Sequence, residues 1–579
     1  MKSIAGAFRR VGLTAVAVAA ALSSLVNAEI EVRSLEERAA SGNRLVFAHF
    51  MIGIVGQRTS ASDYDADMQR AKAYGIDAFA LNIGLDSYTD TQLGFAYQSA
   101  ANNGMKVFIS FDFSYWQTSN GTGVGQKIAQ YAGQSAQLQV NGRPFASSFI
   151  GDGVDVNAIR SGAGSNVYFV PNFHPNTDTS ALDGALSWGA WDSNGNNRAP
   201  SNGVNVTVAQ NDAAYESWLN GKTYLAPVAP WFNTHFSSKN WVFPSGDLLF
   251  TRWNEVIQEG FPMVEIVTWN DYGESHYVGP LSSEHSDDGS SKWANDMPHD
   301  GWLDLSKPFI AAYKNGDTNV ANYITQDQVI YWYRRNLNSL NCDSTDSLGR
   351  PDGYQTLSDT VYVVTLLKSA GSITIKSGSN SQTFNAGAGA NIFTVNAALG
   401  QQTFTLTRNG ANVLSGTSLM DITAVCTCGL YNFNAYVGTL PAGASDPLPP
   451  DGLTQLTAGL QVTTCKPTPS LGTNPPTSTV NNGGGGSSPT PTNCNAGTVA
   501  DGESGNFTGL CQFACSTHRI RFGYCPPGPC VCTGFGPSTP PPTNGRNGCP
   551  IAGEPSSYDG LCSFTCNHGY CPEGACQYC

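Results

Sequence analysis

Short runs of apolar residues alternate with amphipathic stretches along residues 44–307. Apolar runs of this length, bounded by polar turns, are typical of buried strands in a parallel sheet. We predict eight strands, at residues 45–51, 78–83, 106–113, 145–150, 167–170, 185–191, 223–228 and 263–267. Helix-like segments lie between them. In the segment 63–74, for example, Met68 and Ala71 share one side and charged residues take the other, and Ser62 or Asp63 can cap its start.

Eight β/α units in about 260 residues predict a (β/α)8 TIM barrel, which we place at residues 44–340. The alternative is a doubly wound open sheet. That fold carries a glycine-rich phosphate-binding loop after its first strand, and no such loop follows residues 45–51. In a barrel the carboxyl ends of all strands meet at one face, and active sites are built there.

The pattern changes after the barrel. Residues 324–337, with the adjacent aromatics Tyr331, Trp332 and Tyr333, have a helical pattern. From 355 to about 425, short alternating runs are separated by Gly, Asn and Ser turns, which predicts a small antiparallel β-sandwich within residues 341–465. This region holds few residues of catalytic types, so we expect a structural domain packed against the barrel.

The C-terminal part consists of two linkers and two cysteine-rich repeats. Residues 466–493 form a linker rich in Pro, Thr, Ser and Gly, and residues 533–548 form a second one. The sequence GLCQFAC (509–515) matches GLCSFTC (560–566), which defines modules at 494–532 and 549–579. Each module holds six cysteines, an even number that can pair internally and stabilise a fold too small for a core. Metal binding is the alternative, but the paired CxxC units of a zinc site are missing.

The N-terminus has the pattern of a secretory signal peptide over residues 1–28. Lys2, Arg9 and Arg10 precede an apolar run that ends in Val26-Asn27-Ala28, a cleavage pattern. A membrane anchor, the alternative, requires a longer apolar span. Sixteen cysteines in an exported chain indicate disulfides, so we expect a secreted protein, extracellular or associated with a cell wall.

Composition narrows the class of partner. The formal net charge is −14 and only 13% of residues are charged, so a basic surface for nucleic acid or an anionic membrane is not expected. An HExxH zinc motif and a GxSxG nucleophile elbow are both missing. We therefore predict a neutral partner and neither a metal nor a cofactor.

The candidate chemistry gathers after the eighth predicted strand, in MVEIVTWNDYGESHYVGP (263–280). Asp271 and Glu274 are a carboxylate pair of the kind that glycoside hydrolysis requires, one protonated and one ionised. The two residues are three positions apart on a loop, and we expect their carboxyl groups to lie about 6.5–9.5 Å apart, which is the range of inverting enzymes. The alternative is a helix capping box, which has the same spacing.

Other polar and aromatic side chains follow predicted strands and would meet at the same face. Aromatic rings stack on the apolar faces of sugars, and polar groups bind the hydroxyls. The candidate substrate-binding residues are His49, Asp112, Trp116, His174, Trp231, Trp269, Asn270, His276 and Tyr277. For Asp112 the alternative is an ion pair with an arginine, and for His49 and His174 it is a structural role.

Three motifs in this order resemble the fungal α-1,3-glucanase (mutanase) family, glycoside hydrolase family 71: RLVFAHFMIG (44–53), KVFISFDFSYW (106–116) and TWNDYGESHYVGP (268–280). The resemblance implies inverting hydrolysis of α-1,3-glucosidic bonds in insoluble glucan, with Asp271 and Glu274 as the catalytic carboxylates. We assign Glu274 as the acid and Asp271 as the base. The two cysteine-rich repeats resemble the α-1,3-glucan-binding modules of carbohydrate-binding module family 24.

These observations predict a secreted, monomeric, endo-acting α-1,3-glucanase attached to solid substrate by its tail modules. Two other interpretations stay open. One is a catalytically silent wall-binding protein, and the other is a glucanase that cleaves a different linkage, because only the resemblance selects α-1,3.

Overall fold

The computed structural model describes residues 44–441 without a gap and, in the tail, residues 494–499, 530–535, 546, 548–551, 562, 566, 571 and 576–579. The chain divides into two compact units, residues 1–481 and 482–579. The predicted signal peptide, the linker 466–493 and most of both cysteine-rich modules lie outside the described residues. A search of the described residues finds no helix that is both long and apolar enough to cross a membrane.

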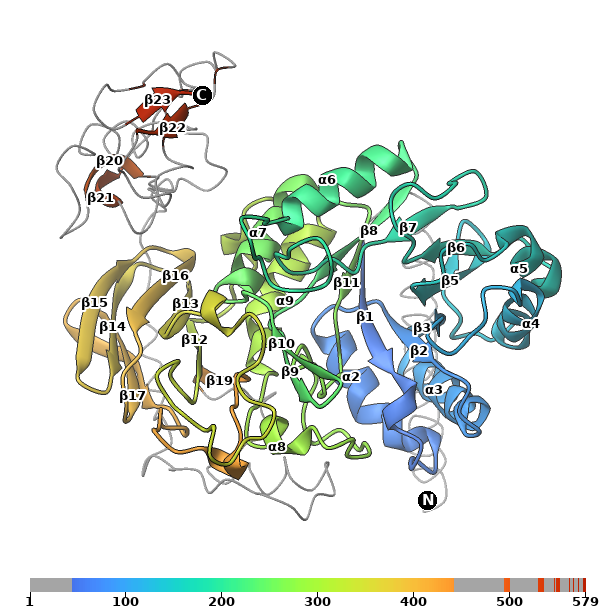
Figure 1. The fold of residues 1–579 in the computed structure, drawn as a ribbon, viewed down its shortest axis with the longest axis horizontal. Coiled ribbons are helices and arrows are strands. Elements are labelled where there is room, and N and C mark those ends of the chain that lie inside the picture. The colour runs from blue at the N-terminus through green and yellow to red at the C-terminus, as the bar shows by residue number, and fades with distance from the viewer. Residues whose placement is uncertain are drawn as a thin grey trace, which may run out of the picture. The chain divides into compact units, whose positions relative to one another are not determined.

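A curled parallel sheet forms the centre of the larger unit (Figure 1). Its eight parallel strands are β1 (Leu45–Met51), β2 (Ala78–Ile83), β3 (Lys106–Asp112), β5 (Arg143–Phe149), β6 (Tyr168–Pro171), β7 (Gly184–Leu186), β8 (Thr223–Val228) and β11 (Met263–Ile266). All eight predicted strands are present, although β7 ends five residues earlier than the predicted end at 191. A short antiparallel strand, β4 (Gln139–Val140), extends the sheet beside β5.

The order of the strands shows how the sheet curls. Hydrogen-bonded neighbours follow the order β6-β5-β3-β2-β1-β11-β8-β7, so the first and last parallel strands, β1 and β11, are paired. Between β6 and β7 there is no ladder. One backbone hydrogen bond, from Asp183 N to Phe169 O at 3.3 Å, links the two strands instead. The sheet is that of an α/β fold whose strand ends converge on one rim.

Helices connect the strands and cover the outer face of the sheet (Figure 1). They are α2 (Asp65–Ala73), α3 (Thr89–Asn103), α4 (Gly121–Tyr131), α5 (Val156–Ala163), α6 (Val208–Leu219), α7 (Leu248–Glu259) and α9 (Gly301–Lys314). The helix predicted at 63–74 is α2, preceded by a 3-10 turn (Ala61–Tyr64), and Met68 and Ala71 are buried as predicted. The capping box formed by Ser60 and Asp63 belongs to the 3-10 turn, and α2 itself follows Tyr64 without a side-chain cap, so neither Ser62 nor Asp63 is its N-cap residue.

Alternate residues of each strand face two different cores, as the period of a β-strand requires. Phe47 on β1 packs inside the curl against Phe108 and Phe145, with ring centroids 5.0 and 5.5 Å away. Val46 and Phe50 belong to the larger cluster between the sheet and the helices. Because β1 alternates in this way, His49 shares the inner side with Phe47.

The predicted antiparallel β-sandwich follows the barrel-like part. One sheet has the order β16-β13-β12-β19 and the other β15-β14-β17-β18. The strands are β12 (Gln328–Arg334), β13 (Thr360–Leu367), β14 (Gly371–Ser377), β15 (Asn380–Ala386), β16 (Gly389–Asn396), β17 (Gln402–Arg408), β18 (Ala411–Thr417) and β19 (Ala435–Leu440). A core that includes Phe404 and Leu406 lies between the sheets.

The helix predicted at 324–337 is wrong, because this segment contains strand β12. Tyr331 and Tyr333 belong to the sandwich core, whereas Ile330 and Trp332 belong to the cluster shared with the α/β part. Both faces of the strand are therefore buried, so the run of aromatic and β-branched residues shows no polar face by which sequence reasoning could recognise a strand. The sandwich begins with β12, before the predicted boundary at 341.

The sandwich and the α/β part share one continuous interface rather than a flexible connection. Val437 of β19 belongs to the same buried cluster as Trp302 of α9. The Trp231 indole donates to the carbonyl of Phe433 at 2.9 Å, and His299 Nε2 lies 3.0 Å from the carbonyl oxygen of Ala435.

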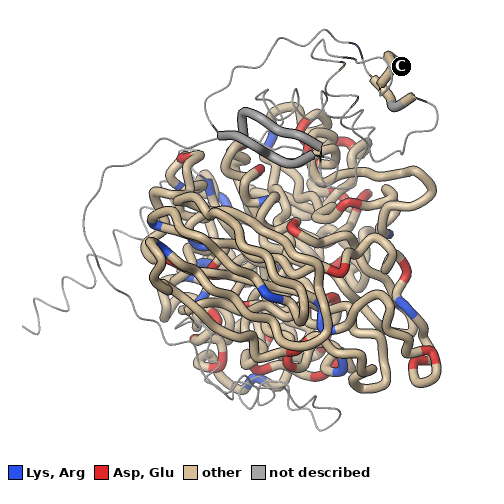
Figure 2. Tube along the Cα trace, turned by 90° about the vertical axis from the view of Figure 1, so that its left-hand side faces the viewer, with Lys and Arg blue, Asp and Glu red and all other residues tan. Residues whose placement is uncertain are grey.

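Acidic and basic residues are interspersed on the face shown in Figure 2, where no continuous basic stripe is visible.

Disulfides occur where the sequence predicts them. Cys342 and Cys426 are joined within the larger unit. In the second repeat the pairs are Cys549–Cys579, Cys562–Cys576 and Cys566–Cys571. All six cysteines of that repeat therefore pair internally, as predicted. The tail also contains two antiparallel pairs of strands, β20 (Cys494–Val499) with β21 (Cys530–Phe535) and β22 (Gly548–Pro550) with β23 (Cys576–Tyr578).

Candidate active site

The loop after β11 folds back on itself and gathers the candidate chemistry. The backbone amide of Thr268 donates to the carbonyl of His276 at 2.9 Å, and that of Val278 donates to the carbonyl of Thr268 at 3.0 Å. Gly279 donates to the carbonyl of Trp269 at 2.8 Å, and a Cβ on this glycine would lie only 2.6 Å from that oxygen. The closed loop therefore requires glycine at 279 and brings the side chains between its ends together.

Asp271 and Glu274 form the carboxylate pair of this loop. The backbone amide of Glu274 donates to Asp271 Oδ1 at 3.0 Å, which is one half of a capping box. The Glu274 side chain bonds to Lys239 and His276 instead of completing the box, and no helix follows directly, so the capping-box alternative is not supported. One oxygen of each carboxylate and one nitrogen of His276 all lie within 4.8 Å of one another. The expected separation of about 6.5–9.5 Å refers to whole carboxyl groups rather than to their nearest oxygen atoms, so it stays a prediction.

His276 links the two carboxylates to the floor of the site. It is fully buried, with Nε2 3.0 Å from Glu274 Oε2 and 3.9 Å from Asp271 Oδ2. Its Nδ1 lies 3.1 Å from Thr268 Oγ1, which also accepts the backbone amide of Asp271 at 2.9 Å. Because Nε2 faces a carboxylate oxygen of both Glu274 and Asp271, it carries a proton and donates it to Glu274. His276 is thus a buried hydrogen-bond partner of the pair.

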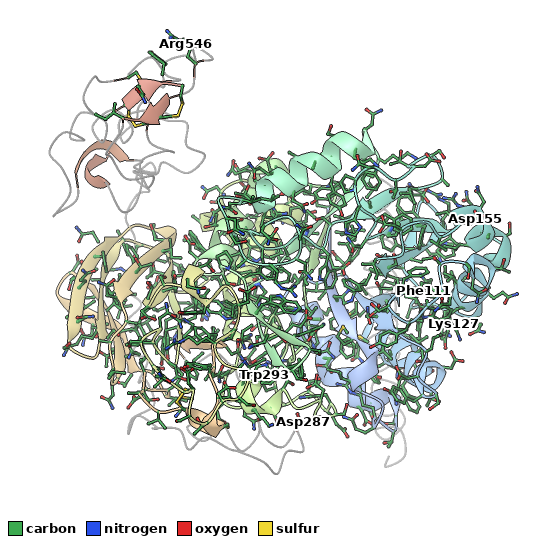
Figure 3. The ribbon with its side chains drawn as sticks, viewed as in Figure 1. Phe111, Lys127, Asp155, Asp287, Trp293 and Arg546 are labelled. Carbon is green, nitrogen blue, oxygen red and sulfur yellow. A yellow bond between two sulfur atoms is a disulfide. The ribbon has the colours of Figure 1, made fainter. Side chains whose placement is uncertain are left out.

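Lys239 completes the site and was not predicted. It starts β10 (Lys239–Val242), which forms a hairpin with β9 (Asn233–Phe236), and its Nζ lies 2.6 Å from Glu274 Oε1. The hairpin is attached to the loop that holds the carboxylate pair, since Asn233 N donates to the carbonyl of Glu274 at 3.0 Å. It also packs on Trp293, whose ring centroid is 4.8 Å from that of Phe236 (Figure 3). In the sequence, the largely apolar stretch 231–243 is interrupted by Ser-Ser-Lys-Asn, and this interruption could have indicated the turn of the hairpin.

The two carboxylates have different environments. Burial, followed by the nearby charge of Glu274, raises the pKa of Asp271 to about 6. Burial also acts to raise the pKa of Glu274, but the hydrogen bond and charge of His276 and the charge of Lys239 outweigh it, and the pKa of Glu274 is lowered. Their side chains are 21% and 17% exposed, so both are reachable from solvent. These opposite shifts in pKa favour Asp271 over Glu274 as the protonated member of the pair.

Three predicted substrate contacts within the loop are buried and hold the loop in place instead. Trp269 is fully buried, and its indole donates to Asp67 Oδ1 at 3.0 Å. Asn270 bonds both backbone groups of Met51, accepting at 2.7 Å and donating at 3.3 Å. Tyr277 is fully buried, and its hydroxyl donates to the carbonyl of Met297. A side chain without exposed surface cannot touch a bound sugar, so the prediction of direct contact is wrong for these three.

Three predicted contacts outside the loop are also buried. His49 is fully buried, with Nδ1 2.7 Å from Glu265 Oε1. Trp116 is 8% exposed, and its indole donates to the carbonyl of Gly84. Trp231 is 2% exposed and holds the sandwich through Phe433. These residues support the rim from below, and none offers a face to substrate.

The last two predicted contacts lie near the rim. Asp112 at the end of β3 is 8% exposed and accepts the backbone amide of Ser114 at 2.8 Å, so the alternative of an arginine partner is not supported. His174 is 65% exposed and lies 2.9 Å from Asp152. Tyr115, which follows Asp112, is 60% exposed and close enough to Lys239 to interact with its charge. It is the more accessible aromatic of the pair 115–116, although Trp116 was the one predicted.

Asp271, Glu274 and His276 are close enough to hold a cation, but their hydrogen bonds do not leave the ligand atoms free for one. Glu274 Oε1 already faces the ammonium of Lys239, and Oε2 faces His276. A metal ion would have to displace both contacts. The arrangement is that of a hydrogen-bonded acid–base pair, and the expectation that the protein needs no metal or cofactor stays a prediction.

Comparisons with known proteins place this chain in a family. The model of glycosyl hydrolase family 71 matches residues 42–449. A mutanase of Penicillium rubens is 42% identical over 410 residues, which is 70% of this chain and 90% of that protein. In Schizosaccharomyces pombe, a glucan endo-1,3-alpha-glucosidase is 34% identical (69% and 95% covered) and an ascus wall endo-1,3-alpha-glucanase is 30% identical (68% and 96%). The matched region contains the curled sheet, the loop with Asp271 and Glu274, and the sandwich, and the chain is therefore a member of glycosyl hydrolase family 71.

Proposed function

We propose that this protein hydrolyses α-1,3-glucosidic bonds in insoluble α-1,3-glucan, cleaving within the chain. The relatives named for this activity are covered over at least 90% of their length. The observation that carries the proposal is the pair Asp271 and Glu274, held by one loop at the end of β11 and partly open to solvent. We also propose that the curled sheet is the complete (β/α)8 barrel of a glycosidase, with this pair at its carboxyl-end rim.

In the proposed mechanism Asp271 donates the proton and Glu274 acts as the ionised partner. Asp271, whose pKa is raised to about 6, can hold a proton in mildly acidic solution and deliver it to the glycosidic oxygen. Glu274, kept ionised by Lys239 and His276, takes a proton from the attacking water. His276 and Thr268 fix both groups without contacting substrate.

We propose inversion at the anomeric carbon, as the family resemblance implies. The nearest ligand atoms of the pair lie within 4.8 Å of each other, and the range of about 6.5–9.5 Å between whole carboxyl groups is the one that leaves room for an attacking water in inverting enzymes. NMR of the first product in deuterated water tests this. Initial β-anomer from the α-linkage means inversion, whereas initial α-anomer means retention, with Glu274 as the nucleophile.

Reducing-sugar release separates the enzyme from a wall-binding protein. Wild type is expected to release sugar from α-1,3-glucan, and Glu274→Gln and Asp271→Asn are expected to bind the polymer without releasing it. Binding without release by wild type as well would leave only the wall-binding alternative. A panel of β-1,3-, α-1,4- and mixed-linkage glucans tests linkage, and a preference for any of these over α-1,3-glucan would contradict the proposal.

We further propose that residues 1–28 direct secretion and that the two cysteine-rich modules bind glucan, while the protein acts as a monomer without nucleic acid or membrane. The internally paired cysteines of 549–579 support a self-contained module. A flexible attachment to solid substrate raises the local concentration of cleavable bonds. Removing residues 466–579 should then weaken binding to insoluble glucan and spare hydrolysis of soluble oligosaccharides.

A further inference from the structure

A second cavity lies beside the carboxylate pair on the same rim. It has a volume of about 310 Å³ and opens where β5, β6 and β7 end. Its wall includes Trp191, whose ring centroid is 5.4 Å from that of His276, the partner of Glu274. The cavity is therefore next to the reacting groups, and its size is at the lower end for small-molecule sites.

The lining of this cavity is uncharged. It combines aromatic rings with amides, hydroxyls and one histidine, and it contains no Lys, Arg, Asp or Glu. Three other cavities among the described residues do contain such groups, for example the one with Asp247, Arg252 and Glu255 beside α7. A neutral ligand with one apolar face and several hydroxyl groups suits this lining, whereas an anion or a cation would find no counter-charge in it.

Trp188 provides a fixed aromatic surface in this cavity. Its half-buried ring is held edge-on by Phe149 and by His49, each with a centroid distance of 4.9 Å. His49 is itself fixed by Glu265, because both are fully buried and lie 2.7 Å apart. The buried pair on β1 and β11 thus supports the ring from inside the curl, so little conformational entropy is lost when a ligand stacks on it.

His174 provides an oriented polar group in the same cavity. Although 65% exposed, it makes two hydrogen bonds with Asp152: its backbone amide donates to Oδ1 at 2.8 Å, and Nδ1 lies 2.9 Å from Oδ2. A carboxylate on Nδ1 favours the tautomer in which Nδ1 carries the proton and Nε2 accepts. The exposed ring therefore presents an acceptor for a hydroxyl group.

We propose that this cavity is a binding subsite for one glucose unit of the glucan chain, with Trp188 stacking on the sugar ring and His174 Nε2 accepting a sugar hydroxyl. The inference rests on the proposed function, since the same chain must also reach Asp271 and Glu274. It assigns a role to the buried pair His49–Glu265, which takes no part in the proposed acid–base chemistry.

The test uses the full-length protein and α-1,3-linked glucose oligosaccharides from the trimer to the octamer. Trp188→Ala should raise KM about tenfold for the longer oligomers and leave kcat within about twofold, the signature of lost ground-state binding. Oligomers too short to fill this subsite and span the carboxylate pair at the same time should be unaffected. Trp188→Phe should keep most of the affinity, and His174→Ala should raise KM about threefold with the same dependence on length.

The control variant is Phe384→Ala, because Phe384 is a partly buried aromatic residue on β15 of the sandwich, where it packs on Phe393, outside the cavity lining. It should leave the length dependence of KM unchanged. The inference is overturned if Trp188→Ala and His174→Ala leave KM for long oligomers at the wild-type value, or if kcat falls equally at every length. If Trp188→Ala does not fold, the exposed His174→Ala decides alone. An inactive wild type would refute the proposed function instead.

Discussion

Lys239 Nζ lies 2.6 Å from Glu274 Oε1, although the two residues come from different elements, a hairpin after β8 and the loop after β11. Lys239 is 49% exposed, and Glu274 is 17% exposed. The contact therefore lies at the mouth of the site, where it stabilises the ionised form of Glu274 and can be altered without opening the core.

Replacing Lys239 should change the pH dependence of the reaction. Glu274 must be ionised to act as the base, so kcat/KM falls as the pH drops through its pKa, which Lys239 helps to lower. In Lys239→Met this pKa rises, and the acid limb of the kcat/KM profile should move to higher pH by about 1 unit. Lys239→Arg keeps the charge and should keep the wild-type limb. An unchanged limb in Lys239→Met would show that His276 alone sets the ionisation of Glu274.

The basic limb should report Asp271. Its pKa of about 6 means that the proton needed for the leaving group is lost as the pH rises above that value, so kcat/KM should decline there. Asp271→Asn cannot donate this proton and should lower kcat on oligosaccharides by about 10²–10⁴. On α-glucosyl fluoride, whose leaving group needs no proton, Asp271→Asn should be much less impaired than Glu274→Gln. The reverse order would restore Glu274 as the acid.

Asp271→Asn should also stabilise the protein at neutral pH. The folded-state pKa of Asp271 is raised to about 6 from the usual 3.8 of an aspartate, so its contribution to stability is present below the lower value and is lost as the pH rises through the higher one. Asn removes this cost and still accepts the amide of Glu274 through its carbonyl oxygen. We expect about 1–2 kcal/mol of added stability at pH 7 and little at pH 4, measured by thermal unfolding. Equal effects at both pH values would contradict the assignment.

Thr268→Val should remove the hydroxyl group that connects the backbone of Asp271 to the ring of His276. The Thr268 hydroxyl accepts the backbone amide of Asp271 at 2.9 Å and lies 3.1 Å from His276 Nδ1. Without it, a buried imidazole nitrogen and an amide lose their partner, and the positions of both carboxylates change. We expect kcat to fall about tenfold or more with little change in KM, while Thr268→Ser keeps wild-type values. A rise in KM alone would instead indicate a binding role for Thr268.

Removing the Cys342–Cys426 disulfide should destabilise the whole larger unit. The bond closes a segment of 84 residues that includes most of the sandwich, and the sandwich shares its buried cluster with the α/β part. The double variant Cys342→Ser/Cys426→Ser should lose about 2–4 kcal/mol, seen as one cooperative transition at lower temperature. Two separate transitions would show that sandwich and barrel unfold independently.

The eight strands could be predicted because each is determined by a short stretch of the sequence. A buried strand such as β2 or β8 is a short apolar run between turns, and that signal depends on no other part of the chain. The place of Asp271 and Glu274 after the last strand follows from the same order. The internal pairing of the six cysteines in 549–579 could be predicted from their even number in one short repeat.

The tertiary structure decided what depends on distances between elements. Whether Trp116, Trp269 and Tyr277 are buried or open depends on what packs above them, and their residue type is the same in either case. Segment 328–334 became a strand because two cores cover its two faces.

The carboxylate pair shows the same division. The sequence alone determined that Asp271 and Glu274 share one loop at the rim, three residues apart. Their close approach, and which of them holds the proton, depend on His276 within the loop and on Lys239 from a hairpin 35 residues away. Pairwise electrostatic energies depend on separation and burial, and these exist only once the chain has folded.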